Sequence, residues 1–130
     1  MKLGATLYIR NTVEAVPFYR EAFGLTLGYH EKFSDGTYLH ASLLRDGEEL
    51  FAVSESKNDA MVRAMLASTL RGSRPTMSYG LQFTSEDEVR KAYSMLQQGG
   101  TVLCPLGPLP WSACAADVVD RYGVYWYICV

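Results

Sequence analysis

The sequence of 130 residues contains few of the side chains that build metal and redox sites. It has two histidines, His30 and His40, and three cysteines, Cys104, Cys114 and Cys129. No two cysteines are spaced as C-x-x-C, and an odd number of cysteines argues against a framework of disulfides or a zinc site. We therefore expect free, buried thiols.

The sequence also lacks a basic stripe and an uninterrupted apolar segment. The net charge is −2 and the basic residues are scattered, so nucleic acid is not an expected partner. The longest uncharged run, Ala92 to Ala116, contains two glutamines and three prolines, which would leave polar groups unpaired in lipid. Because no apolar leader precedes the first alternating segment, we expect a cytoplasmic protein with no membrane partner.

What the sequence does contain is typical of one globular domain. Apolar residues make up 48% and charged residues 20%, which allows a sizeable core. Leu7 and Ile9 alternate with polar neighbours and predict a strand. A helix follows, with Asn11 as its cap, Glu14 closing a capping box, and an apolar stripe formed by Val13, Val16, Tyr19 and Phe23. Three more strands are predicted near 25–33, 37–45 and 49–54, separated by two Asp-Gly turns.

The same order of elements then recurs. Leu81 and Phe83 predict a strand, Ser85 and Glu88 a capped helix, and Val89, Ala92, Tyr93 and Leu96 its apolar stripe. Strands are predicted at 101–104, near 112–119 and at 124–129, with a Pro/Gly-rich loop at 105–110. We expect a single domain, 1–130, built of module one (about 1–55), a helical connector (about 56–75) and module two (about 76–130). The connector helix is predicted from Met61, Val62, Met65 and Leu66, and it ends at Gly72 and Pro75.

Three segments carry a resemblance to a known superfamily by their order and spacing. They are Ala15–Tyr19 with Ala22–Gly24, Asp35-Gly36 with His40-Ala41, and Val119–Trp126. On these residues, the chain resembles over essentially its whole length the vicinal-oxygen-chelate superfamily of glyoxalase I, ring-cleaving dioxygenases and bleomycin-resistance proteins, and within it the PhnB-like branch. The resemblance implies an α+β fold in which the mixed sheets of two βαβββ modules curl into an open barrel around a cavity, with the helices on the outside.

If the fold is of this kind, strand alternation predicts which side chains face the cavity. The prediction places Leu7, Ile9, Leu39, Ala41 and Leu43 under the first helix. The side chains predicted to line the cavity are those of Gly4, Thr6, Tyr8, Tyr38, His40, Ser42, Ala52, Ser54, Ser78, Gly80, Gln82, Tyr125, Tyr127 and Cys129. Trp126 is expected to pack against the second helix.

The resemblance also implies a place for a metal ion, and this chain lacks the residues for it. Metal-using relatives carry His, Gln or Glu at positions that match Gly4, Ala52, Ser78 and Tyr127. Glycine, alanine and serine do not replace such ligands, and one tyrosine does not assemble a site. We therefore expect no metal and no cofactor.

The candidate binding residues combine aromatic rings with a few polar groups, as expected where a planar or apolar small molecule is held. They are Tyr8, Tyr38, His40, Ser42, Gln82, Trp111, Tyr125 and Tyr127. The first hypothesis is metal-independent binding of a small apolar or aromatic molecule by a homodimer. The alternatives are a metal-independent enzyme that uses His40 and a tyrosine, and a metal-dependent lyase or dioxygenase whose ligands lie elsewhere. Packing alone is a competing explanation for each aromatic residue.

Overall fold

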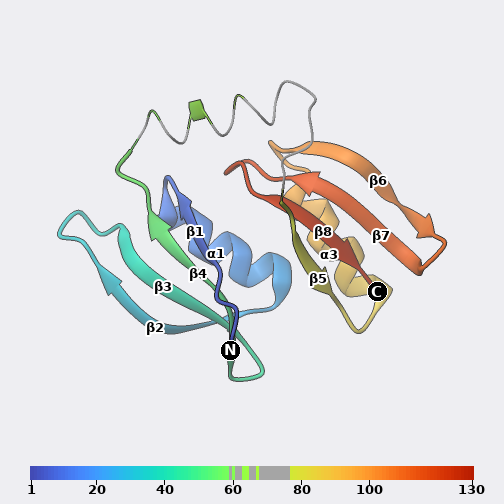
Figure 1. The fold of residues 1–130 in the computed structure, drawn as a ribbon, viewed down its shortest axis with the longest axis horizontal. Helices are drawn as coiled ribbons and strands as arrows, with labels where there is room; N and C mark the ends of the chain where they lie inside the picture. Colours follow the sequence, from blue (N-terminus) through green and yellow to red (C-terminus); the bar gives the residue numbers. More distant parts are fainter. Residues whose placement is uncertain (59, 61–62, 65–66, 68–76) are drawn as a thin grey trace. The chain divides into compact units, whose positions relative to one another are not determined.

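A computed structural model describes the whole chain except residues 59, 61–62, 65–66 and 68–76. The chain divides into two compact units, Met1–Val62 and Arg63–Val130, and each unit contains a mixed four-stranded sheet and a helix that covers it (Figure 1). The predicted α+β class with two βαβββ modules is therefore confirmed. The residues that predict the connector helix all lie outside the described part of the chain. That the two units form one domain stays a prediction.

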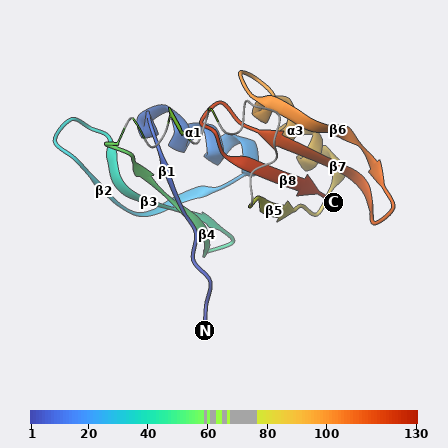
Figure 2. The same cartoon turned by 45° about the horizontal axis from the view of Figure 1, so that its top comes forward.

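The first unit follows the predicted order of elements closely. Its elements are β1 (Thr6–Ile9), α1 (Thr12–Phe23), β2 (Thr26–Lys32), β3 (Tyr38–Arg45) and β4 (Glu48–Glu55). The sheet order is β1-β4-β3-β2, and β1 pairs with β4 in parallel while the other pairs are antiparallel. Figure 2 shows α1 lying along one face of this sheet.

The core of the first unit is the contact between α1 and the face of the sheet it covers. Tyr19 and Phe23 stack on one another, and both meet the ring of Phe51 on β4 edge to face. Leu7, Ile9, Ala41 and Leu43 are buried beneath α1 as predicted, but Leu39 is 44% exposed. The prediction that Val13 belongs to the apolar stripe of the helix is wrong, because Val13 is 54% exposed. Its neighbour Thr12 is fully buried instead.

The N-terminus of α1 is capped by a residue that the sequence did not indicate. Asn11 adopts a left-handed conformation and makes no capping hydrogen bond; its side chain instead donates to Glu14 at 2.7 Å. The backbone N–H groups of Asn11 and Thr12 donate to the carboxylate of Glu55, at 2.9 and 2.8 Å. A carboxylate at this end of a helix is favoured by its charge as well as its hydrogen bonds. Glu55 thus ties the end of β4 to the start of α1.

The second unit repeats the arrangement with β5 (Tyr79–Gln82), α3 (Glu86–Leu96), β6 (Thr101–Leu109), β7 (Ser112–Val119) and β8 (Tyr125–Cys129). Its sheet order is β5-β8-β7-β6, again with one parallel pair, β5 with β8. The predicted helix cap is confirmed, because Ser85 Oγ accepts the backbone N–H of Glu88 at 3.3 Å. The Glu88 carboxylate in turn accepts the backbone N–H of Thr84 at 3.2 Å.

The predicted loop at 105–110 is wrong, because β6 continues to Leu109. Pro105 and Pro108 lie within a strand that pairs only with β7 and whose register shifts three times. A strand at the edge of a sheet forms a ladder on one side only, so it tolerates residues that lack a backbone donor. The prolines therefore distort the strand instead of ending it. In the described part of the chain, no helix is long and apolar enough to cross a membrane.

A buried carboxylate fixes the turn between β7 and β8. Asp120 is 3% exposed, and its Oδ1 accepts the backbone N–H groups of Tyr122 and Val124 at 2.8 and 3.0 Å. Its Oδ2 accepts the indole N–H of the fully buried Trp126 at 2.8 Å. Trp126 is thereby held on the face of the sheet that α3 covers, as predicted.

The indole hydrogen bond to Asp120 predicts a large effect of a conservative substitution. Trp126→Phe keeps an aromatic ring but leaves Asp120 Oδ2 without the indole N–H in a buried site, and it removes ring volume. We expect the free energy of unfolding to fall by about 2–4 kcal/mol, measured by urea denaturation. Trp111→Phe is the matched control, because Trp111 is 72% exposed and should change stability by less than about 0.5 kcal/mol. Equal stability of both variants would contradict this role of Asp120.

Candidate functional site

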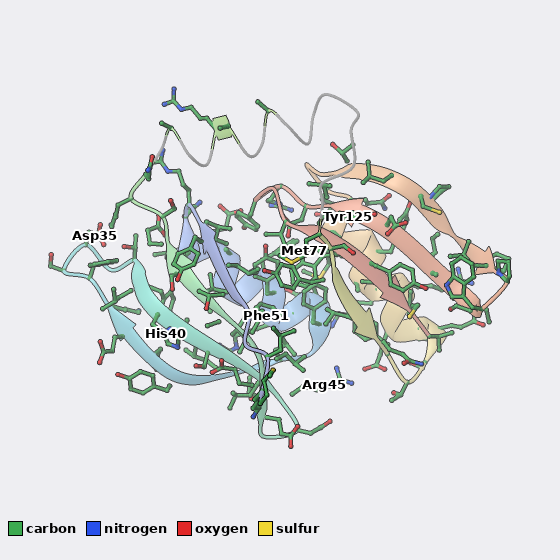
Figure 3. All side chains as sticks on the ribbon, viewed as in Figure 1. Asp35, His40, Arg45, Phe51, Met77 and Tyr125 are labelled. Atoms are coloured by element: carbon green, nitrogen blue, oxygen red, sulfur yellow. The ribbon has the colours of Figure 1, made fainter. Side chains whose placement is uncertain are left out.

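Except for Tyr38 and Trp111, the candidate residues fall into two groups, one on each sheet, and each group lies on the face opposite the helix. In the first unit, this face carries Tyr8 on β1, which is 65% exposed and stands opposite Ser54 in the register. It also carries His40, which Figure 3 labels on β3, and Ser42, which stands opposite Ala52. We refer to these two surfaces as the face opposite α1 and the face opposite α3.

The polar centre of the face opposite α1 is a hydrogen bond between His40 Nε2 and Ser42 Oγ, 3.1 Å long. His40 is half-buried and Ser42 is 4% exposed. The ring of Tyr29 on β2 lies 5.9 Å from the imidazole, and its hydroxyl donates to Glu31, which raises the pKa of Tyr29. The sequence pattern did not indicate Tyr29, because an irregular register in β2 brings it to this face.

The prediction that Tyr38 shares a face with His40 and Ser42 is wrong. In the register, Glu31 stands opposite His40 but Lys32 stands opposite Tyr38, so β3 contains one extra residue there. Such a bulge shifts the alternation of side chains. Tyr38 consequently turns to the other side, where its ring meets the imidazole of His30 at 6.0 Å and the ammonium of Lys32 at 5.0 Å. The same bulge leaves Leu39 exposed.

On the face opposite α3 the predicted alternation of β8 is confirmed. Trp126 and Ile128 are fully buried on the side of α3, while Tyr125, Tyr127 and Cys129 are half-buried and point the other way. Gln82 on β5 stands opposite Cys129 in the register. Figure 3 labels Tyr125 at the start of β8.

Two hydrogen bonds organise the aromatic side chains of this face. The exposed indole of Trp111, in the turn between β6 and β7, donates to the Tyr127 hydroxyl at 2.8 Å. The Tyr125 hydroxyl donates to Asp117 Oδ1 at 3.2 Å, and Asp117 stands directly opposite Tyr127. Asp117 was not predicted as a site residue, although pairing β7 with β8 at the short Asp120–Gly123 turn would have placed it beside the tyrosines. Burial raises the pKa of the Tyr127 hydroxyl above 10.0, and the hydrogen bond from Trp111 opposes this in part.

The residues at the four positions that match the metal ligands of relatives do not fit a metal ion. At the positions that match the metal ligands of relatives, Gly4 and Ala52 offer no donor atom, Ser78 offers only a hydroxyl, and the Tyr127 hydroxyl already accepts the indole of Trp111. Within the described residues, no three His, Cys, Asp or Glu side chains gather closely enough to hold an ion. All three cysteines are free, but only Cys114 is buried, so the expected burial is wrong for Cys104 and Cys129.

Comparisons with known proteins agree with the fold. The sequence model described as Glyoxalase/Bleomycin resistance protein/Dioxygenase superfamily matches residues 4–128. Among solved structures, the chain is similar to the PhnB protein from Bacillus cereus, described as a putative 3-demethylubiquinone-9 3-methyltransferase, with a TM-score of 0.76 and 25% identity over 99% of this chain and 98% of that chain. Among curated proteins, no sequence matches.

Two further solved structures show the fold at lower identity. A protein from Pseudomonas aeruginosa has a TM-score of 0.68 and 24% identity, over 99% of this chain and 96% of that chain. The fosfomycin resistance protein FosX from Listeria monocytogenes, solved with Mn(II) and 1S,2S-dihydroxypropylphosphonic acid, has a TM-score of 0.66 and 13% identity, over 99% of this chain and 90% of that chain. This likeness shows a shared fold. The Mn(II) ion and the phosphonic acid are ligands of FosX.

The raised pKa of Tyr127 predicts a pH dependence of stability. Because the pKa is higher in the folded than in the unfolded chain, the contribution of Tyr127 to stability is complete below about pH 10 and is lost as the pH rises through the folded-state pKa. We expect Tyr127→Phe to lose less unfolding free energy between about pH 9 and about pH 11 than the parent protein. Urea denaturation at each pH measures this, with Tyr93→Phe on α3 as the control. A pH dependence unchanged by Tyr127→Phe would contradict the assignment.

Proposed function

Because this chain belongs to the glyoxalase/bleomycin resistance protein/dioxygenase superfamily, we propose that it binds a small, largely apolar or aromatic molecule without the help of a metal ion. The observation that carries the proposal is the aromatic arrangement on the face opposite α3. Trp111 and Tyr127 are joined by a hydrogen bond that orients both rings, and Tyr125 is oriented in the same way by Asp117. Aromatic side chains held in fixed orientations suit the recognition of a flat or apolar ligand.

The face opposite α1 supplies a second set of candidate contacts. Tyr8 offers an exposed ring, and His40 and Ser42 form a linked pair of hydrogen-bonding groups. On the face opposite α3, Gln82 adds an amide from β5. A few polar groups among apolar contacts fix the orientation of a ligand and distinguish it from others. Tyr38 is not part of this set, because it lies on the other side of its sheet.

Metal independence is supported by the donor set. Divalent metals bind to proteins through several converging nitrogen, oxygen or sulfur donors, and three of the four positions used by relatives lack a competent ligand here. Chemistry that depends on a metal, as in lyases or dioxygenases of this fold, is therefore disfavoured.

A methyltransferase activity is also disfavoured, although it is the activity suggested for the PhnB protein of Bacillus cereus. A site for a methyl donor of the usual kind requires a glycine-rich turn between a strand and a helix. The junction between β1 and α1 consists of Arg10 and Asn11, and that between β5 and α3 runs from Phe83 to Ser85. Neither junction contains a glycine.

The second candidate function is a metal-independent enzyme centred on His40. The observation that favours it is the hydrogen bond between His40 and Ser42, since an imidazole bonded to a hydroxyl can accept its proton. A third group that orients the imidazole is not found among the hydrogen bonds of the described residues, so ligand binding remains the first proposal. A homodimer is part of the proposal as well, and light scattering coupled to size-exclusion chromatography tests it.

Binding of a neutral aromatic probe tests the proposed function. We expect N-phenyl-1-naphthylamine to bind equally well before and after treatment with EDTA, with metal analysis of the same sample showing no stoichiometric zinc, nickel, iron or manganese. Trp111→Ala should weaken binding about tenfold, because it removes a large contact surface and an orienting hydrogen bond. Val102→Ala is the matched control. Val102 is exposed on β6 and stands opposite Val118, so its side chain lies on the α3 side of the sheet, away from the proposed binding face. A stoichiometric metal, or binding that needs one, would refute metal independence.

Replacing His40 separates binding from catalysis. We expect His40→Ala to lower the affinity for the ligand by a factor of about three to ten, as for one lost hydrogen bond. Any chemical conversion of a bound ligand should persist in this variant. His30→Ala is the control, because His30 is exposed, lies on the other side of the sheet beside Tyr38, and is hydrogen-bonded to the nearby Gly28 carbonyl. Native mass spectrometry identifies a co-purified molecule and follows its turnover. A loss of turnover in His40→Ala with unchanged folding would favour the enzyme.

A further inference from the structure

The strands of the second unit contain a single charged residue. In β5, β6, β7 and β8 every side chain is uncharged except that of Asp117 on β7. The basic residues of the described part of this unit lie elsewhere: Arg63 lies before β5, Arg90 and Lys91 lie on α3, and Arg121 lies in the turn before β8. Asp117 therefore gives the face opposite α3 one negative charge that no strand residue compensates.

The surroundings of Asp117 are aromatic and neutral. Tyr127 stands directly opposite it on β8, and Tyr125 donates to its Oδ1. Cys104 stands opposite it on β6. Trp111 adjoins the cluster through its hydrogen bond to Tyr127. The half-buried carboxylate makes no ion pair with any residue in the described ranges.

These features have a simple electrostatic consequence. A carboxylate that is partly removed from water attracts a cation and repels an anion more strongly than an exposed one does. The faces of tyrosine and tryptophan rings also attract a cation, through their negative quadrupole. All four side chains therefore favour the same kind of charge on a ligand.

We propose that the face opposite α3 binds an aromatic or apolar molecule that carries an amine cation, with Asp117 as the counter-ion and Trp111, Tyr125 and Tyr127 as the rings around it. This inference rests on the proposed binding function and adds the charge of the ligand to it. It also gives Asp117 a role beyond accepting the hydrogen bond from Tyr125, since the side-chain oxygen of an asparagine can also accept that bond.

Three indole compounds that differ in charge test the inference. They are tryptamine (a cation), tryptophol (its neutral counterpart) and indole-3-acetate (an anion), titrated into the full-length protein and followed by the backbone amide signals of β7 and β8 in NMR spectra. We expect tryptamine to bind about tenfold more tightly than tryptophol, and indole-3-acetate to bind most weakly. Equal affinities for tryptamine and tryptophol would overturn the inference and leave the proposed function standing. No binding of any of the three would overturn both.

Substitution of Asp117 links the selectivity to one carboxylate. Asp117→Asn keeps the shape and an acceptor for Tyr125, and it should bring the affinities for tryptamine and tryptophol to within about twofold of each other. Asp117→Glu should retain the preference for the cation. Asp87→Asn, which removes an exposed carboxylate from α3 in the same unit, should leave the preference unchanged. A full tenfold preference retained in Asp117→Asn, or a preference lost equally in Asp87→Asn, would overturn the assignment.

Discussion

The buried carboxylate of Asp120 is the constraint from which the arrangement of the second unit follows. By binding two backbone N–H groups of its own turn and the indole of Trp126, it fixes where β8 starts and which of its side chains face α3. Because neighbouring side chains of a strand point to opposite faces, holding Trp126 under the helix sends Tyr125 and Tyr127 to the other face. The candidate binding surface thus depends on a hydrogen bond made on the far side of the sheet.

Much of this fold could be predicted from the sequence because its signals are local. Asp-Gly turns, a Ser–Glu capping box and alternating strands each involve residues a few positions apart, and they located β3, β7 and α3 to within a residue or two. Where a partner distant in the sequence decides the structure, prediction failed. Glu55 caps α1 from 43 positions away, and the edge position of β6 allows Pro105 and Pro108 inside a strand.

The candidate site shows the same division. Strict alternation placed Tyr8, Tyr125 and Tyr127 correctly, because β1 and β8 pair with their neighbours without an irregularity. Strict alternation misplaced Tyr38, since one extra residue in β3 before His40 turns the side chain of Tyr38 to the opposite face of the sheet. Asp117 was overlooked for a different reason. A single acidic residue among small apolar ones gives no pattern in the sequence, and its importance appears only when pairing with β8 places it between two tyrosines.

The irregular β6 has a consequence for how this protein can associate with itself. A regular edge strand offers a row of unpaired N–H and C=O groups to any other strand, which promotes sheet extension between molecules. Two prolines and three shifts of register interrupt that row in β6. The irregularity of β6 therefore disfavours edge-to-edge pairing of this strand between copies of the chain. It also lowers the tendency of this apolar strand to promote aggregation.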